Sequence, residues 1–211
     1  MPLPSGNLHG TGMIFLAKKR AKKLNPRRVP MPKSMSDLDE ILEEATRDDM
    51  YHAWLLVFNA LIERGKIKTD EIPALADDVT HYTGNSSFPR HKKEDEITRA
   101  ENIMGIPTPY TNLSPDNIKS LIDLERFKQR IFKNATHIAL CVICLGLDYT
   151  RRFTEDELRQ IFFNVDLTLS EIDHGCNSFA SIEKVLNGYG LKIERVDDNI
   201  QCFSIAESGT L

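Results

Sequence analysis

Apolar side chains recur at spacings of three and four residues, with one skip, over residues 34–66. This is the pattern of an amphipathic α-helix. Ser36 can cap the helix, and acidic side chains follow it in the first turn, where the helix dipole favours anions. Gly65 is the expected C-terminal cap. The apolar positions are Leu38, Ile41, Leu42, Ala45, Met50, Ala53, Trp54, Val57 and Leu61.

Five further helices are predicted from the same spacing combined with start and stop signals. Ser114-Pro115-Asp116 is a strong helix start, because it combines a cap, a proline at the first position and an acid. TEDE at 154–157 is a capping box. The predicted ranges are 69–82, 94–105 with Gly105 after its end, 114–147 with a break near Asn134, 154–172 ending at Gly175, and 178–186 closed at Gly188.

The apolar period changes near the C-terminus. LKIERV at 191–196 and IQCFSI at 200–205 alternate apolar and polar side chains around Asp197-Asp198-Asn199. Alternation of this kind around a short polar turn predicts a β-hairpin. We therefore expect a mainly α-helical protein with a small C-terminal β-hairpin.

A shift of 86 residues lays residues 53–79 on residues 139–165 without a gap. In this alignment apolar residues fall opposite apolar residues, and five positions are identical. One interpretation is a helix–turn–helix unit used twice, an internal duplication. The alternative is two unrelated amphipathic hairpins, which share their periodicity by necessity. The identical residues in the first copy are Ala53, Leu61, Asp70, Glu71 and Val79.

This repeat suggests a division of the chain into four parts. Residues 34–86 and 114–211 are the two helical hairpin modules, the second of which includes the β-hairpin. Residues 87–113 are a linker with a short helix. Residues 1–33 hold five of the ten prolines and lack helical periodicity, so we expect an extended or disordered arm.

An RRVP arm at 27–30 precedes these apolar helices, and a capped helix then leads into NVDLTLSEIDHGCNSFASIEKVLNGYG at 164–190. This order of motifs resembles a group of small uncharacterised phage and prophage proteins of Gram-positive bacteria. The resemblance covers 24–33 and about 135–194, and it implies a phage context and a helical fold but no activity. Matching positions are Val165, Leu169, Ser170, Ile172, Gly175, Ile182, Val185, Leu186, Tyr189 and Gly190.

Charge is divided unevenly along the chain. The net charge is −4, yet residues 1–33 contain eight basic and no acidic side chains. Such an arm suits contact with the phosphates of nucleic acid, but a solvated tail or a nuclear localisation signal has the same composition. No aromatic residue lies within 17–33, so base stacking is not supported. The candidate nucleic-acid-binding residues are Lys18, Lys19, Arg20, Lys22, Lys23, Arg27, Arg28 and Lys33.

No run approaches the roughly 20 consecutive apolar residues of a membrane span. MIFLA at 13–17 is too short for a signal-peptide core, and its positive charges follow rather than precede it. We therefore expect a cytoplasmic protein that does not bind membranes and keeps its cysteines reduced.

His137, Cys141 and Cys144 share one face of a predicted helix, where they could ligate zinc together with His174 or Cys176. The competing interpretation is a pair of core thiols, because the run around them is apolar and Leu55 and Phe58 occupy the equivalent positions of the repeat. We expect core thiols and no cofactor, with a small metal-binding protein as the alternative.

The motifs of common enzyme classes are missing from the sequence: there is no phosphate loop, dinucleotide fingerprint, H-E-x-x-H or G-x-S-x-G. Asp48 and His52 lie one helical turn apart and could act as acid and base, although a surface ion pair is far commoner. We expect a non-enzymatic binding or regulatory protein of phage origin. Its partner is another protein or a second copy of the chain, and its basic arm is a candidate contact for DNA or RNA.

Overall fold

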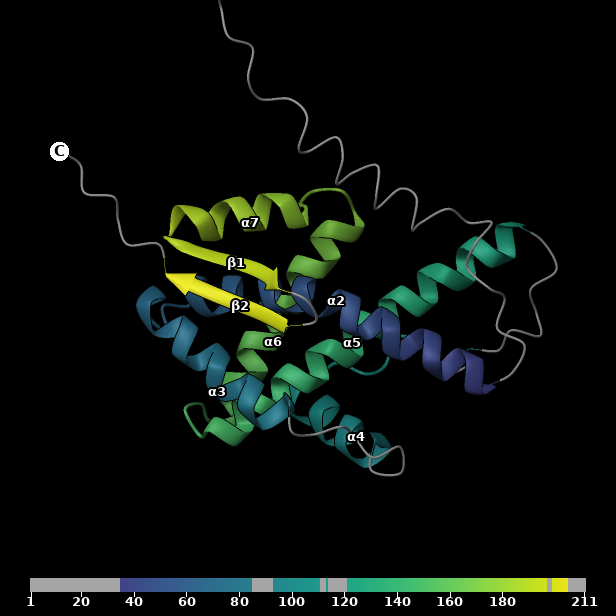
Figure 1. The fold of residues 1–211 in the computed structure, drawn as a ribbon, viewed down its shortest axis with the longest axis horizontal. Coiled ribbons are helices and arrows are strands. Elements are labelled where there is room, and N and C mark those ends of the chain that lie inside the picture. The colour runs from purple at the N-terminus through teal and green to yellow at the C-terminus, as the bar shows by residue number, and fades with distance from the viewer. Residues whose placement is uncertain (1–34, 85–92, 111–112, 114–120, 197–198, 205–211) are drawn as a thin grey trace, which may run out of the picture.

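The structure, a computed structural model, describes residues 35–84, 93–110, 113, 121–196 and 199–204. Within these residues the protein is mainly α-helical, as the sequence predicts (Figure 1). The elements are α2 (Met35–Glu63), the short 3-10 helix η1 (Thr69–Glu71), α3 (Ile72–Gly84), α4 (Lys93–Met104), α5 (Leu121–Thr150), α6 (Glu155–Asp173), α7 (Phe179–Gly188), β1 (Leu191–Val196) and β2 (Asn199–Ser204).

The two long helices, α2 and α5, pack against each other and supply half of the buried residues of the main hydrophobic core. Phe58 and Leu61 of α2 are fully buried, as are Leu140, Ile143 and Leu147 of α5. Burying apolar side chains of this size supplies the main stabilisation of a globular fold. A single core cluster joins residues of both halves of the chain, 34–86 and 114–211.

Helix α5 is long and apolar enough, over Ile122–Thr150, to cross a membrane by length and composition. Most of its apolar window is buried inside the protein. The core helix of a soluble protein passes the same test, so this property is weak evidence for a membrane span.

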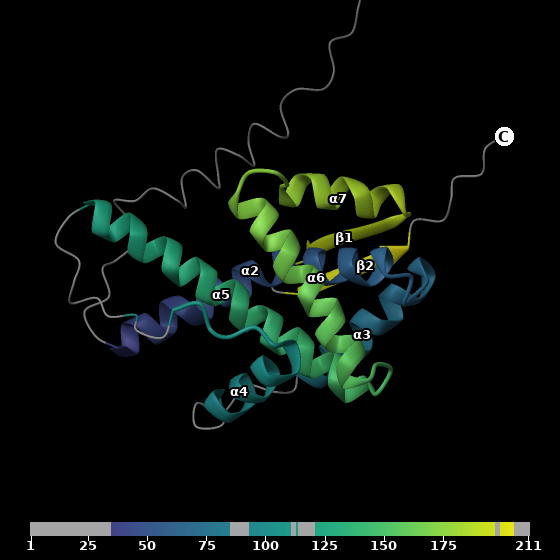
Figure 2. The same cartoon turned by 180° about the vertical axis from the view of Figure 1, so that it is seen from behind.

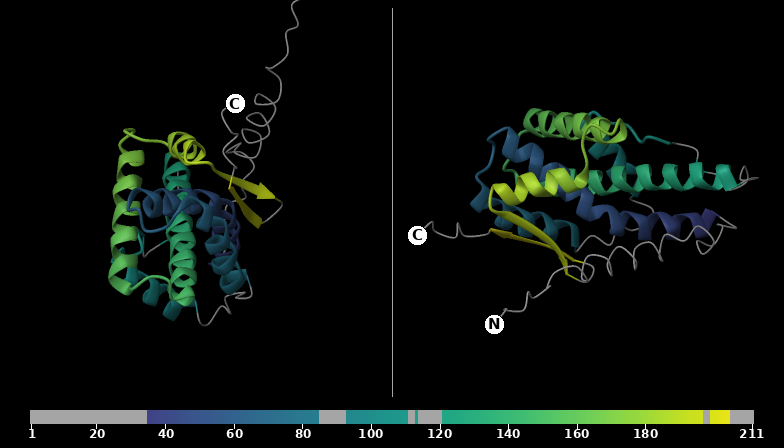
Figure 3. Two further views of the ribbon diagram at one scale, coloured as in Figure 1. Left: turned by 90° about the vertical axis from the view of Figure 1, so that its left-hand side faces the viewer. Right: turned by 90° about the horizontal axis from the view of Figure 1, so that it is seen from above.

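The second helix of each half packs on the first helix of the other half. Helix α3 packs mainly on α5, whereas α6 packs on α2 and α4 more than on its sequence neighbour α5. The structure therefore does not confirm two self-contained hairpin modules, and it leaves the internal duplication a hypothesis. Figure 3 shows α6 along one outer side of the molecule, with α2 and α5 between it and the β-hairpin.

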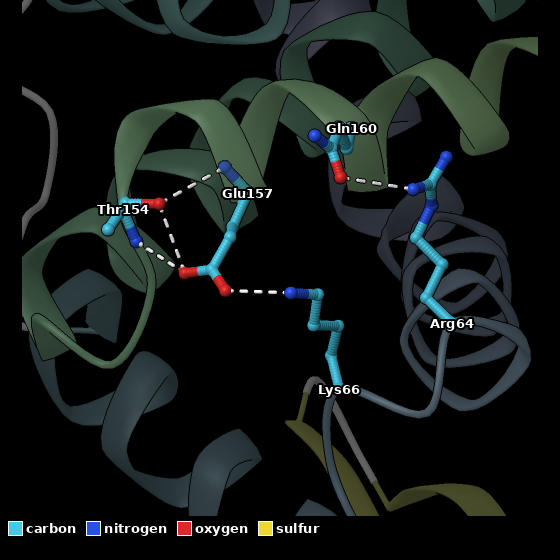
Figure 4. Close-up of polar contacts among 5 residues, drawn as sticks. All are labelled: Arg64, Lys66, Thr154, Glu157 and Gln160. Atoms are coloured by element: carbon cyan, nitrogen blue, oxygen red, sulfur yellow. Dashed lines mark hydrogen bonds and ion pairs between the residues drawn. The ribbon is translucent and has the colours of Figure 1, made fainter.

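Polar side chains in the loop after α2 form hydrogen bonds with side chains in the first turns of α6. Lys66 Nζ lies 2.8 Å from Oε1 of Glu157, and Arg64 donates a hydrogen bond to Gln160 (Figure 4). Arg152, which follows α5 and lies two residues before Thr154, pairs with Asp78 of α3 at 2.6 Å. Lys66 and Arg152 occupy equivalent positions under the 86-residue shift.

The predicted start and stop signals are confirmed at several helices, but Ser36 is not the cap of α2, because the helix already includes Met35. Thr154 and Glu157 form a reciprocal capping box at the start of α6. Gly65, Gly105 and Gly175 follow their helices with φ of +59°, +71° and +72°, a conformation that glycine adopts without strain. The expected stop at Gly188 is wrong by two residues, because Gly190 has the positive φ while Gly188 is still helical.

The break expected near Asn134 is wrong, since α5 is a continuous helix. Asn134 donates a hydrogen bond to the carbonyl of Tyr110 at 2.8 Å and accepts one from the Tyr110 amide at 3.2 Å. Its side chain is thus satisfied by a distant part of the chain and does not compete with the backbone of its own helix.

The predicted β-hairpin is present as an antiparallel pair with Leu191 opposite Ser204. Leu191 and Ile193 are buried in the main core, which explains why alternate positions of β1 are apolar. The second strand begins at Asn199, one residue earlier than expected. The basic arm at 17–33 and the helix start at 114–116 lie outside the described residues.

Candidate functional site

A groove of about 380 Å³ lies between α5, α6 and the segment that follows α4. These elements are seen together in Figure 2. Its walls are mostly apolar, with a few polar groups, which is the usual composition of a binding site. The lining residues are Ile106, Pro109, Phe132, Lys133, Thr136, His137, Leu140, Asp166, Leu169, Ser170, Ile172, Asp173 and Phe179.

Large apolar side chains are exposed at this groove and beside it. Phe132 of α5, which lines the groove, is 46% exposed. Phe163 and Leu167 lie one turn apart on the outer face of α6 and are 57% and 49% exposed. Because residues at this spacing share one side of a helix, α6 presents an apolar stripe that continues toward the groove residues Asp166 and Ser170.

One buried polar side chain, His137, lines the groove and is hydrogen-bonded beneath it to a partly buried carboxylate. The His137 side chain is only 3% exposed, and its Nε2 lies 3.0 Å from Oε1 of Glu101 on α4. Thr108 donates a hydrogen bond to the same Glu101 oxygen. A carboxylate at this distance fixes Nε2 as the donor of the neutral ring, so Nδ1 is left as the acceptor.

The two members of this pair influence each other's protonation. Burial lowers the pKa of His137, and this effect exceeds the opposing effect of the Glu101 hydrogen bond and charge. Burial alone would raise the pKa of Glu101, but hydrogen bonds from Thr108 and His137 lower it overall. At neutral pH the groove lining therefore holds a neutral imidazole backed by a carboxylate.

The two candidate thiols lie in the core. Cys141 Sγ is 3.5 Å from His137 Nε2, and both Cys141 and Cys144 are buried. Burial raises the pKa of each thiol well above its usual range, and the neighbouring charge of Glu101 adds to this effect at Cys141. A thiol that stays protonated is a poor nucleophile and a poor metal ligand.

The metal-binding alternative finds no support in the described part of the chain. No group of three or more His, Cys, Asp and Glu side chains is arranged there to hold a metal ion. His174 and Cys176, the proposed additional ligands, lie exposed just after α6.

The structure pairs His52 with Asp49, the neighbour of the Asp48 suggested by spacing. His52 Nδ1 lies 2.7 Å from Oδ1 of Asp49, whose other carboxylate oxygen is buried and has no hydrogen-bond partner. The His52 ring packs on Phe179 with a centroid distance of 4.2 Å, and it lies near Phe132. His52 therefore packs beside two aromatic residues of the groove lining, Phe179 and Phe132.

No family model matches this chain, and no curated protein or solved structure matches it. The geometry alone therefore has to indicate what the groove does.

Among its candidate site residues, the sequence singled out only His137 of this groove, and for a different role. Glu101 was missed because its partner, His137, lies 36 residues away along the chain. Asp49 was missed for a different reason, since its partner His52 lies only three residues away on the same helix. Asp166 could have been noticed, because an acid between Phe163 and Leu167 interrupts an otherwise apolar stripe. The eight basic residues of the arm, Lys18 to Lys33, lie outside the described residues.

Proposed function

We propose that this chain is a non-enzymatic binding protein that holds a segment of a partner protein in the α5–α6 groove. The observation that carries this proposal is the exposed Phe132 in the groove lining, together with the exposed Phe163 and Leu167 of α6, which flank the lining residue Asp166 along the helix. Isolated apolar side chains on a surface are ordinary, whereas apolar side chains grouped beside a concave site are typical of an interface.

The energetics suit a reversible interaction. Fully burying a Phe or Leu side chain stabilises a complex by about 1.5–3 kcal/mol, and these three side chains are already about half covered. The three together therefore supply a few kcal/mol before the cost of association is subtracted. The partly exposed groove walls Leu169 and Ile172 add further apolar contact area.

The proposal is tested by selecting 15-residue peptides from a display library on the full chain, with the Leu167→Asp variant used for counter-selection. Selected peptides should bind one to one, and Phe163→Ala or Leu167→Ala should weaken binding at least tenfold. Val185→Ala is the matched control, because Val185 is a similarly exposed apolar residue on α7. The affinity of Val185→Ala for the selected peptides should stay within twofold of the wild-type value.

Two results would contradict the proposal. One is a selection that returns no peptide sensitive to Leu167. The other is light scattering that shows the chain dimerising through Leu167, which would replace the partner protein by a second copy of the chain.

The internal duplication is also a proposal, supported by the exchange of second helices between the halves and by the equivalent positions of Lys66 and Arg152. Fragments 34–92 and 93–211 should fold only when they are produced together, because each supplies a helix to the other's core. Independent folding of either fragment, seen by circular dichroism, would contradict this arrangement.

The cellular context follows from the sequence expectations. We propose a phage-derived regulatory protein that acts in the host cytoplasm and uses its basic arm at 17–33 as a secondary contact for nucleic acid. The support is the eight basic side chains without an acid and the order of motifs shared with the phage group.

A further inference from the structure

Asp166 stands at the centre of the proposed binding surface. It lies on α6 between Phe163 and Leu167, it is exposed, and it lines the groove. No described residue forms a hydrogen bond or an ion pair with its carboxylate. A partner segment that covers Phe163 and Leu167 also covers Asp166 and removes water from it.

Among the described lining residues, no basic side chain is left unpaired to compensate this charge. Lys133 is the basic side chain of the lining, and it is already paired with Asp173 at 2.5 Å. His137 is engaged with Glu101 and stays neutral at pH 7. Burying a carboxylate without a partner is strongly unfavourable, so a bound segment has to bring its own positive charge.

The rest of α6 also carries more acidic than basic side chains. Its residues 155–173 contain six acidic side chains and a single arginine, Arg159, which lies next to Glu155 at 2.9 Å and Asp156 at 3.6 Å. Charge complementarity thus favours a cationic partner both at the contact itself and during the approach to it.

We propose that the α5–α6 groove binds a peptide segment of a partner protein that carries a lysine or arginine flanked by apolar side chains, with the cationic group paired to Asp166. This inference rests on the proposed function and names the chemistry of the partner. The apolar neighbours cover Phe163 and Leu167, and the stem of the basic side chain packs on the apolar wall of the groove. Acidic segments and nucleic acid are disfavoured by the same carboxylate.

The test uses the full chain and three fluorescein-labelled 15-residue peptides based on the best sequence from the display selection. They differ only at the basic position, which holds Lys, Gln or Glu. Fluorescence anisotropy should show the Lys peptide binding at least tenfold more tightly than the Gln peptide, and the Glu peptide more weakly still. Asp166→Asn should reduce the Lys-over-Gln preference at least fivefold.

Two matched variants make the result specific to Asp166. Asp156→Asn removes the same charge from the same helix outside the groove, and it should leave the preference unchanged. Asp166→Lys should invert the preference so that the Glu peptide binds best, which a merely structural role of Asp166 would not produce. Circular dichroism checks that each variant is folded.

The outcomes separate this inference from the proposed function. Equal binding of the three peptides would overturn the inference and leave the groove as a binding site. Failure of all three to bind would overturn the groove itself. A synthetic peptide of residues 13–33 that binds more tightly than the Lys peptide and displaces it would replace the partner by the chain's own basic segment, and it would also overturn the proposal.

Discussion

Single side chains in this protein acquire their properties from distant parts of the chain. His137 of α5 is buried beside Glu101 of α4, and Asn134 of the same helix is bonded to Tyr110. Each of these polar groups lies in or near the core, where an unsatisfied hydrogen-bonding group is costly. The contacts therefore fix α4 and the segment after it against α5, and they shape one side of the groove.

The lowered pKa of His137 predicts a dependence of stability on pH. The unfolded chain takes up a proton on this histidine near pH 6.5, before the folded protein does, so folding stability is complete above that pH and falls as the pH drops through it. The loss is at most about 1.4 kcal/mol per pH unit for one proton.

His137→Gln keeps a donor for Glu101 and removes the titrating group. Chemical denaturation at pH 7.5 and 5.5 should show a smaller loss of unfolding free energy for the variant than for the wild type. An equal loss in both proteins would mean that His137 does not titrate differently in the folded and unfolded states.

At the scale of helices and strands, the sequence predicts several helix ends, but it does not predict how the helices pack on one another. The capping box at Thr154 and the stop at Gly65 depend only on residues within one turn, so the local sequence is sufficient to predict them. The break expected at Asn134 failed because its hydrogen-bond partner lies 24 residues away. The groove was not predicted, since it depends on α6 crossing to pack on α2 and α4.

The capping box of α6 should contribute measurably to stability. Thr154→Ala removes the side-chain acceptor of the Glu157 amide, and loss of such a cap typically costs about 1 kcal/mol. We expect a fall in Tm of about 2–4 °C by calorimetry, since the chain is about 200 residues long. Thr154→Ser restores the hydroxyl and should recover most of this loss. If Thr154→Ser is as unstable as Thr154→Ala, the loss of stability comes from the methyl group of threonine and not from its hydroxyl.

The same box predicts acid sensitivity at the start of α6. The hydrogen bond from Lys66, followed by those from the amide and hydroxyl of Thr154, lowers the pKa of Glu157 to about 2. The stabilising effect of a carboxylate with a depressed pKa is present above its unfolded pKa near 4.5 and disappears as the pH falls toward 2. Glu157→Gln should therefore lower Tm at pH 7 but have little effect near pH 2, and an effect of equal size at both values would contradict this explanation.

At the scale of the whole molecule, opposite charges are segregated along the chain. The body from residue 34 onward carries a net charge of −12, while residues 1–33 carry +8. The acidic body should repel nucleic acid, so any binding to DNA is expected to come from the arm and to be weak and independent of base sequence.

A salt titration of duplex DNA binding tests this role of the arm. If about six phosphates are contacted, log K should fall against log salt concentration with a slope near −5, from ~0.9 per phosphate. Replacing Arg27 and Arg28 by alanine should reduce the slope by nearly 2. Equal binding by the full chain and a chain that begins at Ser34, or no binding by either at low salt, would make the arm a solvated tail.

We expect the α5–α6 groove to hold a segment of a partner protein. The most direct measurement is a map of backbone amide chemical-shift changes in the isotopically labelled full chain as a selected peptide is added. We predict the largest changes at Phe132, Leu167 and Leu169, with saturation at one peptide per chain and only small changes around Tyr82 and Tyr149. Changes that centre on α3 or the β-hairpin, or groove residues that do not respond at saturation, would show that the peptide does not bind in the groove.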